Sequence, residues 1–273
     1  MVDVVIIGNV CFDEGYFIRK SGKYDKRKSL GGAGYFSAVG ASLFANTGIV
    51  AKVGEDYDLN NFQKFLNIDI SGIKKISSEK TTTFKTVFHS LDGKNREITG
   101  DVPPNLLLNK NDIIEKFMSA KAFHIATNEP EIQIELIKQI RKFSNALISI
   151  DTIKYYADNP LTLEAFNMAD IAIVEDCFSA LQNTTAPIKI IKHGKNGVDL
   201  ISNGEPKIFE NQNIIKNVVD KTGAGDVFAG SLMANIAKGK DIFKSITIAM
   251  DTATNSIKDY GVEHLHQNIN QLN

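Results

Sequence analysis

The stretch that decides the fold covers residues 217–239 and reads NVVDKTGAGDVFAGSLMANIAKG. A short apolar run is followed by a glycine-rich turn, and residues 226–238 have the apolar spacing of an amphipathic helix. A Gly-Ala-Gly turn can aim successive backbone N–H groups at one point, and a helix start adds unpaired N–H groups and a positive dipole end. The stretch therefore predicts an anion site suited to a phosphoryl group.

Asp226 stands at the predicted start of this helix. A carboxylate there can simply cap the helix, and a bare GAGD sequence favours that interpretation as much as a functional one. A carboxylate that faces a transferring phosphoryl group can also take the proton of an attacking hydroxyl. The chain has no GxxxxGK sequence followed by Ser or Thr, and its glycine-rich runs do not complete GxGxxG, so P-loop proteins and nicotinamide-dependent oxidoreductases are disfavoured.

Composition sets the broad class of protein. The 273 residues are 43% hydrophobic and 23% charged, as in ordinary globular proteins. Lys and Arg number 31 against 32 Asp and Glu, which removes the main argument for a nucleic-acid or membrane-surface partner. Two cysteines cannot form a disulfide framework, the first residues lack the features of a signal peptide, and no apolar run approaches the roughly 18 residues of a membrane span. We expect a cytoplasmic enzyme that acts on a small molecule.

Short apolar runs alternate with helical patterns along the chain. The runs cover residues 4–7, 48–53, 122–125, 146–150, 171–174 and 188–192, and the helical patterns cover residues 35–46, 131–143 and 226–238. Strands that are apolar on successive positions are typical of parallel sheets buried on both faces. The alternation predicts a doubly wound α/β layer structure.

Two segments interrupt this alternation. Residues 12–30 are basic and loop-like, with a short strand expected at residues 16–19, and residues 81–101 have the pattern of a hairpin with its turn at residues 91–95. Together they predict a small β flap, formed by about residues 13–30 and 81–101, on a single domain that spans residues 1–273. Two separate surface excursions are the alternative.

Four segments, in the expected order, resemble the ribokinase-like (PfkB-type) carbohydrate kinase family. They are VVIIGNVCFD at residues 4–13, SLGGAGYFSAVGASLFANTGIVAKVGEDYD at 29–58, IIKHGKNGVDLI at 190–201 and VVDKTGAGDVFAGSLMANIAKG at 218–239. The resemblance implies a three-layer α/β/α sandwich with a mostly parallel central sheet and a small β-strand lid. It also implies an ATP-dependent phosphotransferase whose acceptor is a hydroxyl of a sugar or sugar-like molecule. The alternatives are a nucleoside or polyol (inositol-like) kinase and a non-catalytic ligand-binding member of the fold.

The resemblance assigns the chemical step to the glycine-rich stretch. Asp226 matches the family's general base for the acceptor hydroxyl. The backbone of Gly223, Ala224 and Gly225 matches the anion hole for the γ-phosphoryl group of the nucleotide. Positioning and charge stabilisation are most of what an enzyme contributes to phosphoryl transfer.

The resemblance implies that the acceptor site includes the end of the first strand. Asp13 matches the family's acidic residue for substrate hydroxyls, and a carboxylate can accept hydrogen bonds from two vicinal hydroxyls. Gly31 and Gly32 match glycines that let the substrate approach the backbone. Phe36 stands where sugar kinases of this type commonly have Asn. Either Tyr35 or Ser37 takes over the hydroxyl contact of that Asn, or an aromatic wall favours a flatter acceptor such as a nucleoside.

Five residues are implied on the nucleotide side. Gly194 and Gly197 match the family's nucleotide-side glycines, with Lys192 where Thr is common. Thr222 lies in the glycine-rich turn, and Met250 falls where an Asn near the adenine is familiar. A lysine at residue 192 could touch phosphate or point into solvent.

Metal ligands are where the chain departs from the family. The usual Asn-x-x-Glu sequence is missing, and Glu175 or the neighbouring Asp176 is the carboxylate available for a metal. Mg²⁺ still follows from the use of ATP. Asp220 and Thr222 match positions near a monovalent-cation site in some members, which would hold K⁺. The expected partner is a small-molecule sugar, polyol or nucleoside, without nucleic acid or membrane, and the lid could form a homodimer contact.

Overall fold

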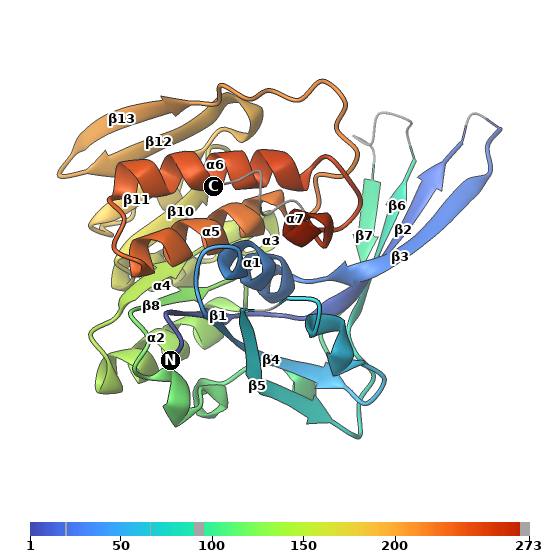
Figure 1. Cartoon of the computed structure of the whole chain (residues 1–273), viewed down its shortest axis with the longest axis horizontal. Helices are drawn as coiled ribbons and strands as arrows, with labels where there is room; N and C mark the ends of the chain where they lie inside the picture. Colours follow the sequence, from blue (N-terminus) through green and yellow to red (C-terminus); the bar gives the residue numbers. More distant parts are fainter. Residues whose placement is uncertain (20, 66, 90–95, 268–273) are drawn as a thin grey trace.

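The computed structural model describes residues 1–19, 21–65, 67–89 and 96–267 (Figure 1). A nine-stranded sheet has the order β13-β12-β11-β10-β9-β8-β1-β4-β5, and a separate four-stranded sheet has the order β3-β2-β6-β7. Within the large sheet, β12 and β13 are antiparallel additions to an otherwise parallel arrangement. No helix in the described part of the chain is long and apolar enough to cross a membrane.

The elements have the following bounds. The large sheet contains β1 Val4–Ile7, β4 Thr47–Gly54, β5 Ile68–Ile76, β8 Ala122–Ile125, β9 Leu147–Ile150, β10 Ile171–Glu175, β11 Ile188–Lys192, β12 Gly197–Ser202 and β13 Glu205–Glu210. The small sheet contains β2 Cys11–Ile18, β3 Tyr24–Gly31, β6 Thr83–Phe88 and β7 Arg96–Thr99. The α-helices are α1 Ala33–Ser42, α2 Pro130–Phe143, α3 Lys154–Ala157, α4 Pro160–Met168, α5 Ala224–Ala237, α6 Ile242–Ser256 and α7 His264–Gln267. Short 3-10 turns include η1 Leu59–Phe62, η2 Pro104–Leu106, η3 Lys110–Asp112, η4 Glu115–Phe117, η5 Leu181–Asn183 and η6 Gly194–Asn196.

The central strands of the large sheet are buried on both faces. Val4 and Ile6 of β1 belong to the apolar core under α1, α5 and α6, whereas Val5 and Ile7 belong to the core under α2 and α4. Successive side chains of a strand point to opposite faces, so an uninterrupted apolar strand serves both layers. The three-layer α/β/α fold with a mostly parallel sheet is confirmed.

The small sheet, called the lid below, stands off the main body (Figure 1). The expected antiparallel pair in residues 81–101 is present as β6 and β7, and the expected turn at residues 91–95 lies outside the described residues. The expectation of a loop with a short strand over residues 12–30 is wrong, because β2 and β3 pair along eight residues each. The polar sequence of β3 concealed the strand: Lys26 and Lys28 lie over the rings of Tyr16 and Phe12, so charged side chains cover the apolar positions of β2.

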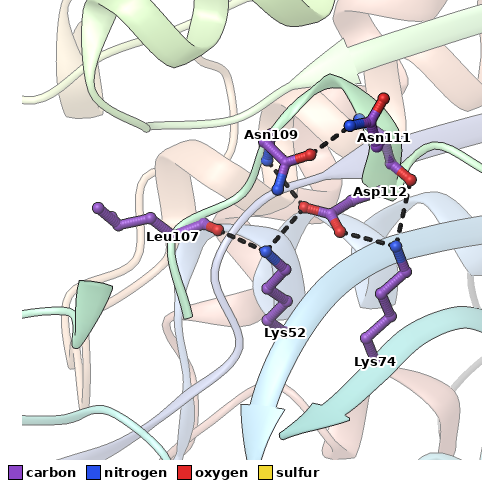
Figure 2. Close-up of polar contacts among 6 residues, drawn as sticks. All are labelled: Lys52, Lys74, Leu107, Asn109, Asn111 and Asp112. Atoms are coloured by element: carbon purple, nitrogen blue, oxygen red, sulfur yellow. Dashed lines mark hydrogen bonds and ion pairs between the residues drawn. The ribbon is translucent and has the colours of Figure 1, made fainter. Parts of the chain in front are cut away.

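An ion cluster around the buried carboxylate of Asp112 fastens residues 107–112 to the edge of the large sheet (Figure 2). The carboxylate of Asp112 lies 3.0 Å from Lys52 Nζ on β4 and 2.8 Å from Lys74 Nζ on β5, and it also accepts a hydrogen bond from the Asn109 N–H. Lys52 Nζ donates a further hydrogen bond to the Leu107 carbonyl. The cluster therefore fixes the loop that crosses the last two strands of the sheet.

Candidate active site

The glycine-rich turn forms the start of α5, as the sequence predicts. Gly223 is the N-cap residue and has φ +75°, a left-handed conformation that favours glycine. A Cβ on Gly223 would also lie 2.3 Å from the ring of Phe36. Asp220 shapes the approach to the turn, since its Oδ1 accepts a hydrogen bond from the Thr222 N–H at 2.9 Å. The first N–H groups of α5 point out of the helix start, as an anion site requires.

Phe36 therefore lies beneath the turn rather than in an open acceptor pocket. Its residue exposure is 4%, and its ring also meets that of Tyr35 edge-on at 5.7 Å. Two more close approaches hold α1 against α5: a Cβ on Gly40 would lie 2.6 Å from the Val227 carbonyl oxygen, and one on Gly230 would lie 1.9 Å from the Ser37 carbonyl oxygen. Small residues at the contact let the two helices approach, and this fixes where α5 begins.

Asp226 lies in the first turn of α5 among several charged groups. Burial raises the pKa of the Asp226 carboxyl well above its usual range, and the negative charge of Asp151 adds to the rise. The ammonium of Lys192 opposes it, while the carboxylates of Asp13 and Glu175 act in the same direction as Asp151. A carboxyl with a raised pKa is a stronger base once ionised, which suits proton transfer near neutral pH.

Lys192 reaches the start of α5 from the end of β11. Its Nζ lies 2.8 Å from Glu175 Oε1, at the end of the adjacent strand β10. Although burial opposes the charge, the negative charges of Glu175 and Asp151 raise the pKa of Lys192, so the side chain is a cation. A Cβ on Gly225 would lie 2.8 Å from the same Nζ. The Lys192 ammonium thus lies beside the glycine-rich turn and does not point into solvent, and its contact with phosphate stays a prediction.

Asp13 and the double glycine lie close together at the base of the lid. Cys11 on β2 pairs with Gly31 on β3, and a Cβ on Gly31 would lie 2.0 Å from Asp13 Oδ2. Gly32 has φ +99°, and a Cβ there would lie 2.3 Å from a carbonyl oxygen. Burial raises the pKa of Asp13 to about 6. The hydrogen bond donated by the Cys11 thiol lowers this pKa, whereas the negative charge of Asp220 raises it. The charge of Asp220 raises the pKa of Asp13, and the charge of Asp13 raises that of Asp226, so the Asp13 carboxyl lies near the glycine-rich turn.

Asp151 is a residue of this site that the sequence reasoning missed. It directly follows β9, is 4% exposed, and accepts a hydrogen bond from the Thr127 hydroxyl at 3.4 Å. His124 Nε2 is 3.7 Å away, but burial lowers the pKa of His124, so this imidazole does not neutralise the carboxylate. A carboxylate directly after an apolar strand was the available signal, because ligand sites of parallel α/β sheets lie at the carboxyl ends of the strands.

The residues predicted for the nucleotide side include Gly194 in η6, Gly197 at the start of β12 and Met250 in α6. Gly194 has φ +57° with open space around it, and Gly197 has φ +117° with the Phe209 carbonyl oxygen 1.9 Å from where a Cβ would lie. Met250 lies on α6 and packs against the core. Its neighbour Asp251 lines a cavity of about 530 Å³ between α6 and residues 213–215.

The described residues contain no group of three or more His, Cys, Asp or Glu side chains arranged to hold a metal ion. Glu175 is paired with the ammonium of Lys192, and Asp176 lies 3.1 Å from the His193 ring nitrogen Nδ1, so the two carboxylates considered for a metal both have side-chain partners. Mg²⁺ bound to a nucleotide takes most of its ligands from phosphates and water, so this donor set suits a metal that arrives with its nucleotide. K⁺ at Asp220 stays a prediction.

Comparison with known proteins gives one family. The model of the pfkB family carbohydrate kinases matches residues 159–268. Among curated proteins, the chain is 26% identical over 284 residues to a cytidine kinase of Thermococcus kodakarensis, covering 96% of this chain and 98% of the relative. It is also 26% identical over 258 residues to a nucleoside kinase of Methanocaldococcus jannaschii, covering 87% of this chain and 82% of the relative.

Solved structures agree with this fold. A ribokinase from Thermotoga maritima superposes with a TM-score of 0.78 at 19% identity, covering 100% of this chain and 99% of that one. A nucleoside kinase from Burkholderia thailandensis in complex with inosine gives a TM-score of 0.81 at 14% identity, covering 96% and 94%. The described architecture is thus that of a ribokinase-like protein with a separate β-sheet lid.

Proposed function

The chain belongs to the pfkB family of carbohydrate kinases, which are phosphotransferases with an alcohol acceptor, and on that premise we propose that it is an ATP-dependent nucleoside kinase. The observation that carries the catalytic part of the proposal is the position of Asp226, in the first turn of α5 with Lys192 and Asp13 among its charged neighbours. One group for the acceptor, one for the phosphoryl group and one base thus meet at a single helix start.

The phosphoryl group is held by the start of α5 and by Lys192. The N–H groups of the Gly-Ala-Gly turn at residues 223–225 and the positive end of the helix dipole would bind the γ-phosphoryl oxygens of MgATP. Lys192 adds a full positive charge beside Gly225. Glu175 holds the ammonium there before the nucleotide binds, and it is the carboxylate able to approach the Mg²⁺ that the nucleotide carries. Positioned charge of this kind is the main contribution of a protein to phosphoryl transfer.

Asp226 accepts the proton of the attacking hydroxyl. The hydroxyl oxygen forms a bond to the γ-phosphorus, the bond from that phosphorus to the leaving ADP oxygen breaks, and the hydroxyl proton passes to the Asp226 carboxylate. Asp13 orients the acceptor by accepting hydrogen bonds from two of its hydroxyls. Because the pKa of Asp13 is raised to about 6, half of the carboxyl is ionised near pH 6 and the carboxylate forms fully only at higher pH.

The acceptor is a nucleoside rather than a free sugar in this proposal. The support is the kind of protein that the chain matches along most of its length, a cytidine kinase and nucleoside kinases. A nucleoside contains the vicinal ribose hydroxyls that Asp13 suits, so the site chemistry accommodates this acceptor. Phe36 does not contribute an aromatic wall to the choice, because its ring is buried under Gly223.

The proposal is tested by acceptor-dependent release of ADP from MgATP across cytidine, adenosine, inosine, ribose, fructose and myo-inositol. We expect kcat/KM to be highest with a nucleoside, and the same nucleoside to raise the melting temperature in the presence of a non-hydrolysable ATP analogue. A free sugar as the best acceptor would replace the nucleoside assignment by a sugar kinase. Binding of a nucleoside without any transfer would support the non-catalytic alternative.

A further inference from the structure

Arg27 and Phe17 of the lid and Tyr260 of the body form one contact between the lid and the body. The guanidinium of Arg27, on β3, lies 3.7 Å from the ring centroid of Tyr260 and 5.5 Å from that of Phe17. The rings of Phe17 and Tyr260 are 6.3 Å apart and meet edge-on. Tyr260 belongs to the segment between α6 and α7, which lies on the lid's side of the body (Figure 1). A lid cation is thus held on a ring that belongs to the body.

The sequence of β2 makes room for this stack. Gly15 is the register partner of Arg27, and a Cβ on Gly15 would lie 2.5 Å from the Phe17 ring. The missing side chain lets the ring of Phe17 lie back along the strand. Residues 13, 15 and 17 share one face of β2 because side chains alternate along a strand. The stack is therefore on the same face of the lid as Asp13, the residue assigned to the acceptor.

The segment that carries Tyr260 is also tied to the phosphate-binding turn. The Val219 N–H donates a hydrogen bond to the Ile257 carbonyl at 2.9 Å, and the next residue, Asp220, shapes the turn through the Thr222 N–H. At its other end, Glu263 accepts a hydrogen bond from the Tyr35 hydroxyl at 3.0 Å. The lid thus contacts, through Tyr260, a segment that is hydrogen-bonded to Val219, just before the glycine-rich turn.

We propose that Arg27 and Tyr260 form a latch through which closure of the lid on the acceptor is coupled to the phosphate-binding turn, and that Tyr260 is a positioning residue for transfer to the acceptor instead of to water. The inference rests on the proposed kinase function. When the latch is open, water replaces the acceptor hydroxyl: its oxygen bonds to the γ-phosphorus, the bond to ADP breaks, and phosphate, ADP and a proton are released. A cation–π contact of this class shifts a closed-to-open equilibrium by about 2- to 30-fold.

The test compares Arg27→Ala, Tyr260→Ala, the double variant and Tyr260→Phe, with Arg19→Ala as the matched control. Arg19 is also a lid arginine, but its ion pair is with Asp25 of the lid. With saturating MgATP and the preferred acceptor, we expect both alanine variants to raise the ratio of ADP formed to acceptor phosphorylated and to raise the acceptor KM by about 2- to 30-fold. The double variant should be no worse than the more affected single variant, and Tyr260→Phe should restore the wild-type ratio because it keeps the ring.

Effects of Arg27→Ala and Tyr260→Ala that simply add, or an unchanged ratio in both, would overturn the latch. Because Arg27→Ala leaves the segment between α6 and α7 intact, a misfolded Tyr260→Ala protein does not remove the test. If the wild-type protein phosphorylates no acceptor, the kinase proposal fails by itself. The latch is then judged by hydrogen exchange of the β2 and β3 amides without ligand, where faster exchange in both alanine variants supports it and unchanged exchange refutes it.

Discussion

Lys192 Nζ and Gly225 are in close contact: the ammonium lies 2.8 Å from the point that a Cβ on Gly225 would occupy. The same ammonium is 2.8 Å from Glu175 Oε1. Because Gly225 has no side chain, the Lys192 ammonium can lie directly beside the start of α5. A helix start with an adjacent lysine concentrates positive potential where a phosphoryl group would bind.

Gly225→Ala should displace this lysine and slow phosphoryl transfer. We expect kcat to fall by roughly 10- to 100-fold, because the methyl group moves a charge that stabilises the transferring phosphoryl group. The measurement is the steady-state rate of acceptor-dependent ADP release. Lys192→Ala and the double variant complete a cycle, in which the double variant should lose no more than Lys192→Ala alone. Additive losses would show that the methyl group acts on the turn itself and not through Lys192.

Much of this arrangement could be predicted from the sequence because it follows local rules. The apolar run at residues 188–192 is β11, and the glycine-rich turn begins α5, since glycine and a following amphipathic pattern specify a helix start directly. The resemblance to a family then grouped Asp13, the double glycine and Asp226. The structure brings these residues toward one edge of the sheet.

The remaining features depend on contacts between distant parts of the chain. Nothing local to Asp151 says that its charge acts on Asp226, because the two residues lie on different elements, after β9 and in α5. The polar sequence of β3 also conceals a strand that is stabilised by pairing with β2 and by lysines over aromatic rings. Register and side-chain placement across strands, not composition, decide such features.

Asp13→Asn should stabilise the folded protein at pH 7.5. The pKa of Asp13 is raised to about 6 by burial, so the folded state favours the neutral carboxyl. The neutral Asp13 carboxyl makes its full contribution to the free energy of unfolding below the ordinary pKa near 3.8. This contribution is lost as the pH rises through about 6 and the folded protein must hold a buried charge. The Asn variant stays neutral, so it should be more stable than wild type by up to about 3 kcal/mol at pH 7.5 and similar at pH 4.

Urea unfolding at several pH values measures this difference. The matched control is Asp25→Asn on the lid, where the hydrogen bond from Arg19 lowers the pKa of Asp25 and the same substitution should bring no gain in stability at pH 7.5. The same pH dependence in wild type and Asp13→Asn would contradict the account. The stabilised variant should nevertheless bind its acceptor more weakly, since it loses a charged hydrogen-bond acceptor.

Asp112→Ala should destabilise the protein strongly while sparing the chemistry. It would leave the buried ammonium of Lys52 and the exposed ammonium of Lys74 without their shared counter-ion (Figure 2). Removing one partner of a buried ion pair costs about 3–5 kcal/mol. Glu55→Ala, which breaks the exposed pair with Lys80, should cost far less because solvent screens that pair. Chemical unfolding of both variants checks the contrast, and equal losses would show that the Asp112 cluster does not hold the sheet edge.

The central claim, that Asp226 is the base of a phosphoryl-transfer site, is tested most directly by the turnover of Asp226→Asn. Asp241→Asn is the matched control, because Asp241 caps α6 and Asn is an equally good cap. We predict that kcat of Asp226→Asn falls by about 10²–10⁴, that its ATP affinity stays within about twofold because the binding groups remain, and that Asp241→Asn behaves as wild type. Turnover of Asp226→Asn equal to that of the wild-type protein would contradict the account.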